Sequence, residues 1–240
     1  MLGMPAPTQF DLNFRLFGIP VRINPWFWLL AVFLCPNRGD GDVMLIVVWV
    51  ACVLVSILVH EFGHGLTAKA FGYRSEIALF GMGGLCASEG DRQTFWQRIA
   101  VILAGPGAGF VLFGLVFGLN RFGLLPLSSL PLQRSVWFLI QINLVWSVVN
   151  LFPLWPLDGG QLLAVLLGRA SPRNGQRWAH VVALVGFGCL AAFLFSKDEI
   201  YNAMVCLLLG FTNYQILQAM HQARQYGYES SEDDADWWKR

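Results

Sequence analysis

Long apolar stretches dominate the chain, and short polar or glycine-rich segments separate them. An α-helix needs about 20 mostly apolar residues to cross a bilayer. Most of the stretches approach or exceed that length, and the first is short for a crossing. The pattern therefore predicts about six membrane spans, at residues 25–34, 43–71, 99–119, 135–168, 178–195 and 200–220.

Three segments interrupt the helical pattern. Residues 14–23 alternate around Gly18, which predicts a short pair of strands. Residues 75–87 carry glycines between apolar strand formers, which favours a β-hairpin. Residues 152–160 place two prolines and two glycines inside the fourth span. We expect the helix to break there, and such a break needs protein or a water-filled cavity around it.

The composition agrees, since 56% of the residues are hydrophobic and only 13% are charged, whereas soluble domains are about a quarter charged. We predict an all-α polytopic membrane protein with about six transmembrane helices and a small membrane-associated β-hairpin. Residues 1–222 would form a single membrane-embedded domain, and residues 223–240 a polar tail. A net charge of +1 without a basic patch argues against a nucleic-acid partner. The oligomeric state stays open.

Basic residues favour one set of loops, and such loops are usually cytoplasmic. A cytoplasmic N-terminus puts on the inner side Arg15, Arg22, Lys69, Arg74, Arg92, Arg98, Arg169, Arg173, Arg177 and Arg224. It leaves outside only Arg38, Arg121, Arg134 and Lys197. We therefore predict an integral membrane protein in which the N-terminus is cytoplasmic.

Candidate chemistry is concentrated in His60-Glu61-Phe62-Gly63-His64, at the end of the second apolar span. Histidines at i and i+4 lie on one face of a helix, where both imidazoles can reach one metal ion. The Glu61 carboxylate can handle a proton beside that ion. Ionisable groups are costly inside a bilayer and are usually functional there. The motif predicts a zinc protease that works within the membrane, with its site toward the cytoplasmic side.

A catalytic zinc usually takes three protein ligands, and Asp158 is the best candidate for the third. It follows the break in the fourth span, on a segment otherwise free of charge. Asp158 could instead cap the helix that resumes there, because Asp is favoured at that position. The Asn150 amide, two turns earlier, could stabilise an oxyanion or bond a neighbouring helix.

Together these motifs resemble the site-two protease family of intramembrane zinc metalloproteases. The family pattern joins HExxH to N-x-x-P-x-x-P-L-D-G, and the chain has HEFGH followed by Asn-Leu-Phe-Pro-Leu-Trp-Pro-Leu-Asp-Gly at residues 150–159. Residues 18–25 also look like the start of the first span in bacterial members. The resemblance therefore indicates a bacterial inner membrane as the location.

The resemblance implies that His60, His64 and Asp158 hold one zinc ion per chain. Glu61 would be the general base, and Asn150 a polar group at the site. The substrate would be a single-span membrane protein, cut within or near its transmembrane helix, so the lipid bilayer is the second expected partner.

In the family, the glycine-rich segment after the HExxH helix forms a membrane-dipping β-hairpin. Here Gly81, Met82, Gly83 and Gly84 occupy that place. A helical substrate must unwind before a peptide bond is exposed, and an edge strand can receive the extended chain by strand addition. We predict that these four residues bind substrate, although a plain loop would carry the same glycines.

The sequence shows no PDZ insert between spans and no CBS domains, so we expect a minimal family member. Two other functions stay open: a metal transporter that uses the same ligands, and an inactive pseudoprotease that binds membrane helices. His180 and His221 have no carboxylate or histidine partner at ligand spacing, and His180, near Arg177, fits the membrane interface. We assign neither histidine a site role.

Overall fold

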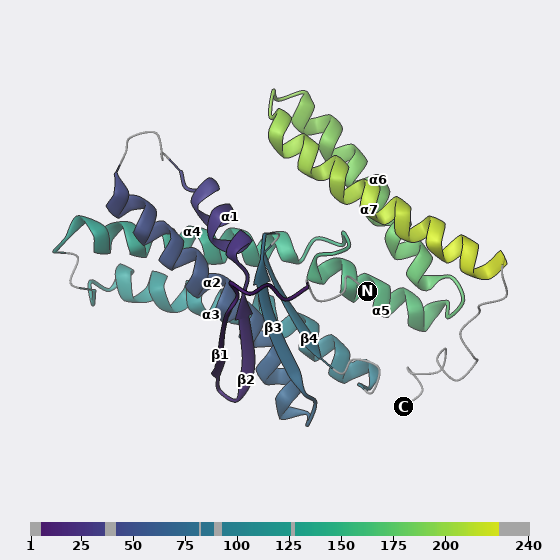
Figure 1. The fold of residues 1–240 in the computed structure, drawn as a ribbon, viewed down its shortest axis with the longest axis horizontal. Coiled ribbons are helices and arrows are strands. Elements are labelled where there is room, and N and C mark those ends of the chain that lie inside the picture. Colours follow the sequence, from purple (N-terminus) through teal and green to yellow (C-terminus); the bar gives the residue numbers. More distant parts are fainter. Residues whose placement is uncertain (1–5, 37–41, 82, 89–92, 126–127, 226–240) are drawn as a thin grey trace. The chain divides into compact units, whose positions relative to one another are not determined.

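The computed structural model describes residues 6–36, 42–81, 83–88, 93–125 and 128–225 (Figure 1). The elements are β1 (Leu12–Leu16), β2 (Ile19–Ile23), α1 (Pro25–Phe33), α2 (Val43–Ala70), β3 (Ser75–Phe80), β4 (Gly83–Ser88), α3 (Phe95–Arg121), α4 (Leu130–Asn150), α5 (Asp158–Ala170), α6 (Gly175–Phe195) and α7 (Ile200–Gln225). In the described part of the chain, five helices are long and apolar enough to cross a membrane: α2, α3, α4, α6 and α7. The predicted fold class, a helical membrane protein with a small sheet, is confirmed.

Two of the predicted spans differ from simple crossings. The first is α1, which has only nine residues. The fourth is divided into α4 and α5, because residues 151–157 are not helical. Helix α4 also begins earlier than predicted, at Leu130, since Pro131 is tolerated in the first turn of a helix. The predicted tail lies almost wholly outside the described residues.

Contacts divide the chain into two compact units. The first comprises Met1–Gly90 and Leu103–Val148, and the second comprises Asp91–Ile102 and Val149–Arg240.

The first unit contains a four-stranded sheet in the order β1-β2-β3-β4. Both predicted strand pairs form, since β1 pairs with β2 and β3 with β4, each antiparallel. The two pairs are joined by a parallel ladder between β2 and β3, which the sequence did not predict. On β2, Ile19, Val21 and Ile23 alternate onto one buried face, as the two-residue period of a half-buried strand requires.

That face of the sheet supplies part of the core of the first unit. Side chains of β2 and β3 pack there with Phe27 of α1 and with Val53, Ile57 and Phe62 of α2. Helix α2 contacts both β3 and β4. At its end, Lys69 donates a hydrogen bond to the Phe17 carbonyl in the β1–β2 turn, at 2.6 Å. The sheet therefore lies against the half of α2 that carries the histidines.

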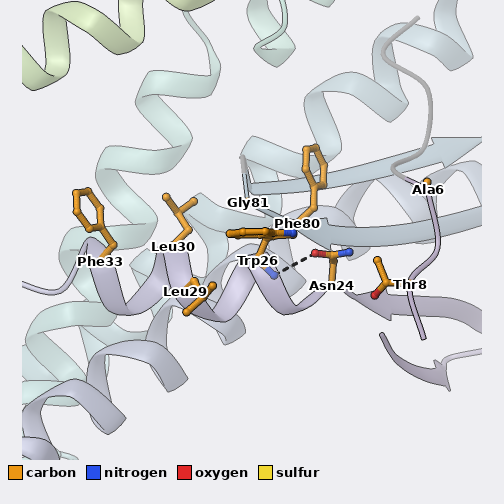
Figure 2. Close-up of a pocket in the computed structure, with 9 residues that line it drawn as sticks. All are labelled: Ala6, Thr8, Asn24, Trp26, Leu29, Leu30, Phe33, Phe80 and Gly81. Carbon is orange, nitrogen blue, oxygen red and sulfur yellow. Dashed lines mark hydrogen bonds between the residues drawn. The ribbon is translucent and has the colours of Figure 1, made fainter. Parts of the chain in front are cut away.

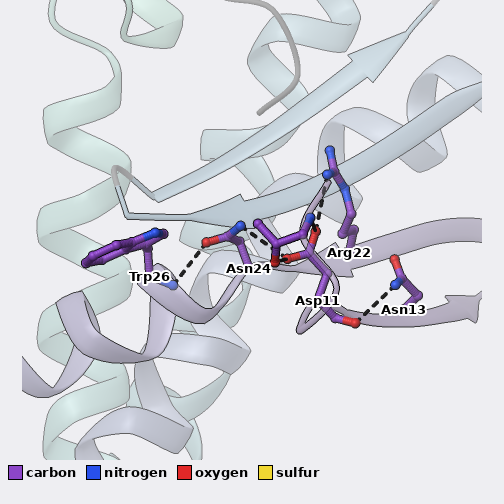
Figure 3. Close-up of polar contacts among 6 residues, drawn as sticks. Asp11, Asn13, Arg22, Asn24 and Trp26 are labelled. Carbon is purple, nitrogen blue, oxygen red and sulfur yellow. Dashed lines mark hydrogen bonds and ion pairs between the residues drawn. The ribbon is translucent and has the colours of Figure 1, made fainter. Parts of the chain in front are cut away.

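A polar network fixes the start of α1 (Figure 3). Asn24 accepts from the Trp26 amide as the N-cap, and its own amide donates to Asp11 at 3.1 Å. Asp11 also accepts from Arg22 at 3.3 Å and from Thr8. The hydrogen bond from the Thr8 hydroxyl, with smaller contributions from the Thr8 amide and Arg22, lowers the pKa of Asp11 below its ordinary value. The network ties the chain before β1 to the first helix.

The second unit is built on α5, α6 and α7. Helices α6 and α7 pack along their length, and α5 packs on α6. Small side chains of Ala183, Ala191 and Cys206 allow close approach around Phe187. Leu154 and Trp155, from the segment between α4 and α5, pack onto the same cluster. That segment is therefore held by the helix pair.

Candidate active site

The two histidines of HEFGH lie one turn apart on α2, and both are buried. Their Nε2 atoms are 3.3 Å apart, and their rings meet edge to face at 4.9 Å. Two nitrogens bound to one tetrahedral zinc at about 2.05 Å would lie about 3.3 Å apart. The observed spacing therefore fits two ligands of one metal ion.

Glu61 is also buried, at 5% exposure. Its position explains why residue 84 of the hairpin is a glycine. An added Cβ at Gly84 of β4 would lie 2.4 Å from Glu61 Oε1 and 2.7 Å from its Cδ. No side chain fits there unless Glu61 moves. Strand β4 thus packs directly against the Glu61 carboxylate, and this contact is possible because Gly84 has no side chain.

A second glycine makes room for His64. An added Cβ at Gly105 of α3 would lie 2.1 Å from His64 Nε2. Nearby, an added Cβ at Gly63 would lie 2.3 Å from the Ala104 carbonyl oxygen. Sequence reasoning missed that Gly105 borders His64.

The other predicted hairpin residues lie elsewhere. Gly81 is next to Trp26, whose Cβ would be 3.3 Å from an added Cβ, and Gly83 has a φ of +120° beside the Trp146 ring. Met82 lies outside the described residues. Of the described glycines in this segment, Gly84 is the one placed against Glu61, and substrate binding by the segment stays a prediction.

An apolar cavity of about 760 Å³ lies beside α1 and the β3–β4 turn (Figure 2). Its lining residues are Ala6, Thr8, Asn24, Trp26, Leu29, Leu30, Phe33, Phe80 and Gly81. Gly81 thus borders this cavity, whereas His60, Glu61 and His64 are not in its lining.

Sequence reasoning also missed a buried polar pair one turn before His60. Asn143 of α4 donates a hydrogen bond to the Ser56 hydroxyl at 2.8 Å and another to the Leu139 carbonyl. Both side chains are at most 2% exposed. This contact fixes α4 beside the face of α2 that carries His60.

In the second unit, Asp158 is the first residue of α5 and is 6% exposed. The N-cap is Leu157, whose own side chain makes no capping hydrogen bond. The alternative that Asp158 serves as the N-cap is therefore wrong. Asn150 is the last residue of α4 and is also buried.

Glycines shape the segment before Asp158. An added Cβ at Gly159 would lie 2.2 Å from the Leu151 carbonyl oxygen, and one at Gly160 would lie 2.2 Å from the Trp155 amide nitrogen. The backbone before α5 thus folds back tightly onto its first turn. The tandem glycines are required by this close approach.

His180 is buried in the second unit, at 5% exposure. Its Nδ1 lies 2.8 Å from Asn213 Oδ1. Sequence reasoning missed this partner, because it stands 33 residues later, on α7.

Comparison with known proteins places the chain among the peptidases. The profile of peptidase family M50 matches residues 48–125 and 126–193, which together exceed half of the chain. The chain belongs to peptidase family M50. The resemblance to site-two proteases is thereby confirmed.

Other M50 proteins show how far the similarity extends. A Synechocystis sp. protein named as a zinc metalloprotease is 35% identical over 209 residues, which cover 80% of this chain and 54% of that protein. Stage IV sporulation protein FB of Bacillus subtilis is 26% identical over 170 residues, covering 64% of this chain and 50% of that one. The M50 chain described here thus spans about half the length of these relatives.

The M50 chain also shares its fold with a solved structure. The site-2 protease from Methanocaldococcus jannaschii superposes with a TM-score of 0.65 at 21% identity, covering 87% of this chain and 95% of that one. Apolar helices and family membership together make this an integral membrane protein.

Proposed function

We propose that the chain is an intramembrane zinc metalloendopeptidase that hydrolyses a peptide bond within or near the transmembrane helix of a membrane-protein substrate. The observation that carries the proposal is the pair of buried imidazoles whose Nε2 atoms lie 3.3 Å apart, with Glu61 beside them on a membrane-length helix. Membership of a peptidase family and similarity to a protein named as a zinc metalloprotease support it.

His60, His64 and Asp158 would hold one zinc ion per chain. All three are buried, and they make up a candidate set of donors of the types that zinc takes. A bound zinc would supply a Lewis acid that polarises the peptide carbonyl and lowers the pKa of water to about 7.

Glu61 would accept the proton of the attacking water and pass it to the leaving amine. Gly84 lies directly against the carboxylate, so the strand proposed to receive substrate runs beside the proposed base. Asn150 would donate an amide hydrogen bond to the carbonyl oxygen as it gains negative charge.

The substrate would be a single-span membrane protein whose helix unwinds at the site. Strand β4 stands at one end of the strand order, and a sheet edge can pair with an extended segment. Gly81, Met82, Gly83 and Gly84 would guide that segment past Glu61. The basic-residue bias supports an orientation with the N-terminus and the site toward the cytoplasm, and the resemblance to bacterial family members supports a bacterial inner-membrane location.

The test compares the wild type with Glu61→Gln, each loaded with zinc in liposomes. The probe is a single-span protein whose apolar segment is interrupted by Asn-Pro. Removing a general base slows such reactions by about 10²- to 10⁴-fold, so we expect that loss with zinc content unchanged. Glu76→Gln, an exposed substitution on β3, is the matched control and should cleave normally.

Other outcomes would point to other functions. Full cleavage by zinc-loaded Glu61→Gln would exclude the base role of Glu61. A wild type that binds the probe without cutting it would be a pseudoprotease, and zinc flux into the liposomes would indicate a transporter. Metal analysis of Asp158→Ala checks the third ligand, since zinc should fall below one ion per chain.

A further inference from the structure

A buried polar chain in the second unit connects α6 and α7 to the segment before Asp158. His180 Nδ1 lies 2.8 Å from Asn213 Oδ1, and Asn213 Nδ2 donates to the Trp155 carbonyl at 2.9 Å. The His180 and Trp155 rings meet at 5.1 Å. Asn213 is fully buried at 0% exposure. Polar groups buried this deeply are usually retained for a specific purpose.

The geometry determines which groups donate and which accept in this network of His180, Asn213 and Trp155. Asn213 Nδ2 donates to two carbonyl oxygens, those of Trp155 and Leu209. A carbonyl cannot donate, so the Asn213 amide has one orientation and its Oδ1 must accept. His180 therefore carries its proton on Nδ1. The Trp155 carbonyl accepts a hydrogen bond from Asn213, and His180 orients the Asn213 side chain.

Trp155 lies three residues before Asp158, and the backbone between them is constrained. The Leu157 amide donates to the Leu154 carbonyl at 2.9 Å, which closes a turn over this stretch. Gln161 Nε2 of α5 donates back to the Pro156 carbonyl at 3.3 Å. Gly160 packs against the Trp155 amide nitrogen. A displacement of Trp155 would therefore be transmitted to the start of α5.

Helix α6 also approaches this segment directly. An added Cβ at Gly186 would lie 2.3 Å from Leu154 Cδ2, so the segment has little room on that side. The segment packs against α6 and accepts side-chain hydrogen bonds from Asn213 and from Gln161. The hydrogen bond from Asn213 is the one that connects the segment to α7, and a single substitution can remove it.

We propose that His180 and Asn213 act as a positioning pair that sets the place of Asp158 through the Trp155 carbonyl. The proposal rests on the proposed function, because it takes Asp158 as a zinc ligand. Partners beyond the ligands orient metal sites, and their loss typically weakens metal affinity by about 10- to 100-fold. One more step separates His180 from the ligand, so about tenfold is expected.

The test measures zinc affinity by competition with a chelator, on full-length protein in detergent. His180→Phe removes the Nδ1 donor at similar volume, whereas His180→Asn places an amide nitrogen near the Nδ1 position. Cys206→Ala, a buried change on α7 without a bond to the segment, is the packing control. We expect about tenfold weaker zinc binding for His180→Phe and for Asn213→Leu, and near wild-type binding for His180→Asn and Cys206→Ala.

A second readout does not depend on zinc. Hydrogen exchange of the metal-free protein should speed up in the peptide covering residues 151–161 for His180→Phe, and not for Cys206→Ala. Unchanged exchange there, or equal loss of zinc affinity in Cys206→Ala, would overturn the proposal.

The variant Asp158→Ala distinguishes the zinc-ligand role of Asp158 from the positioning role of His180 and Asn213. If it loses zinc while His180→Phe binds zinc normally, the positioning pair alone is wrong. If Asp158→Ala keeps full zinc affinity, the proposed ligand set is wrong, and the positioning role is wrong with it.

Discussion

Gly84 on β4 and Glu61 on α2 are in contact so closely that an added Cβ would lie 2.4 Å from the carboxylate oxygen. The carboxylate and the strand proposed to receive substrate are thus neighbours. A substitution at Gly84 would act on the proposed base without touching either histidine.

Gly84→Ala should therefore reduce cleavage and spare zinc. A displacement of about 1 Å in a catalytic group can slow a reaction by about 10²-fold, and we expect a loss of that order. Gly114→Ala on α3 is the control, because no atom lies within 4 Å of its added Cβ. Normal cleavage by Gly84→Ala would show that Glu61 can move without consequence.

Gly105→Ala should act on the metal instead. Its Cβ would lie 2.1 Å from His64 Nε2, so the imidazole must leave its position and zinc affinity should fall by at least about tenfold. Gly107→Ala lies on the same helix and meets no atom within 4 Å. Metal analysis of the two purified variants makes the comparison, and equal zinc content in both would contradict the assignment.

The Ser56–Asn143 hydrogen bond should contribute modestly to stability. Such bonds between membrane helices average about 0.6 kcal/mol and reach about 1.7 kcal/mol. Ser56→Ala should lower the unfolding free energy within that range. A double-mutant cycle with Asn143→Ala isolates the pair, and a coupling energy near zero would mean that the contact is incidental.

These contacts mark what sequence can and cannot predict here. The i, i+4 histidines and the hairpin predicted at residues 75–87 are local patterns, and the elements that carry them formed as predicted. The contacts of Gly84 with Glu61 and of Gly105 with His64 are not local, because each joins two elements that meet only in the folded chain. The partner of His180 was missed for the same reason, since Asn213 stands one helix later.

Acid should weaken one tie between helices α2 and α4. Asp42, the N-cap of α2, forms an ion pair with Arg134 of α4, and the hydrogen bond from Arg134 lowers the pKa of Asp42 below its ordinary value of 3.8. A lowered pKa means that the stabilisation is complete above the unfolded-state pKa and is lost as the pH falls through the folded-state pKa.

Asp42→Asn tests this tie, because asparagine can still cap α2 but cannot pair with a cation. Thermal unfolding should show the wild type more stable than Asp42→Asn at about pH 6, with the difference shrinking as the pH falls below 3.8. If the difference in melting temperature stays constant over this range, the cap or packing at residue 42 causes it, and not the ion pair with Arg134.

The parallel pairing of β2 with β3 has a consequence for biosynthesis. β2 leaves the ribosome before α1 and α2, and β3 leaves after them. The strands β1 and β2 are therefore synthesised before β3 can pair with them, and α1 and α2 insert in between. Because β2 and β3 lie side by side, the chain must come back through α1 and α2 to the free edge of β2. Lys69 meets Phe17 at that return, so the β1–β2 pair becomes part of the surface on which the hairpin is assembled.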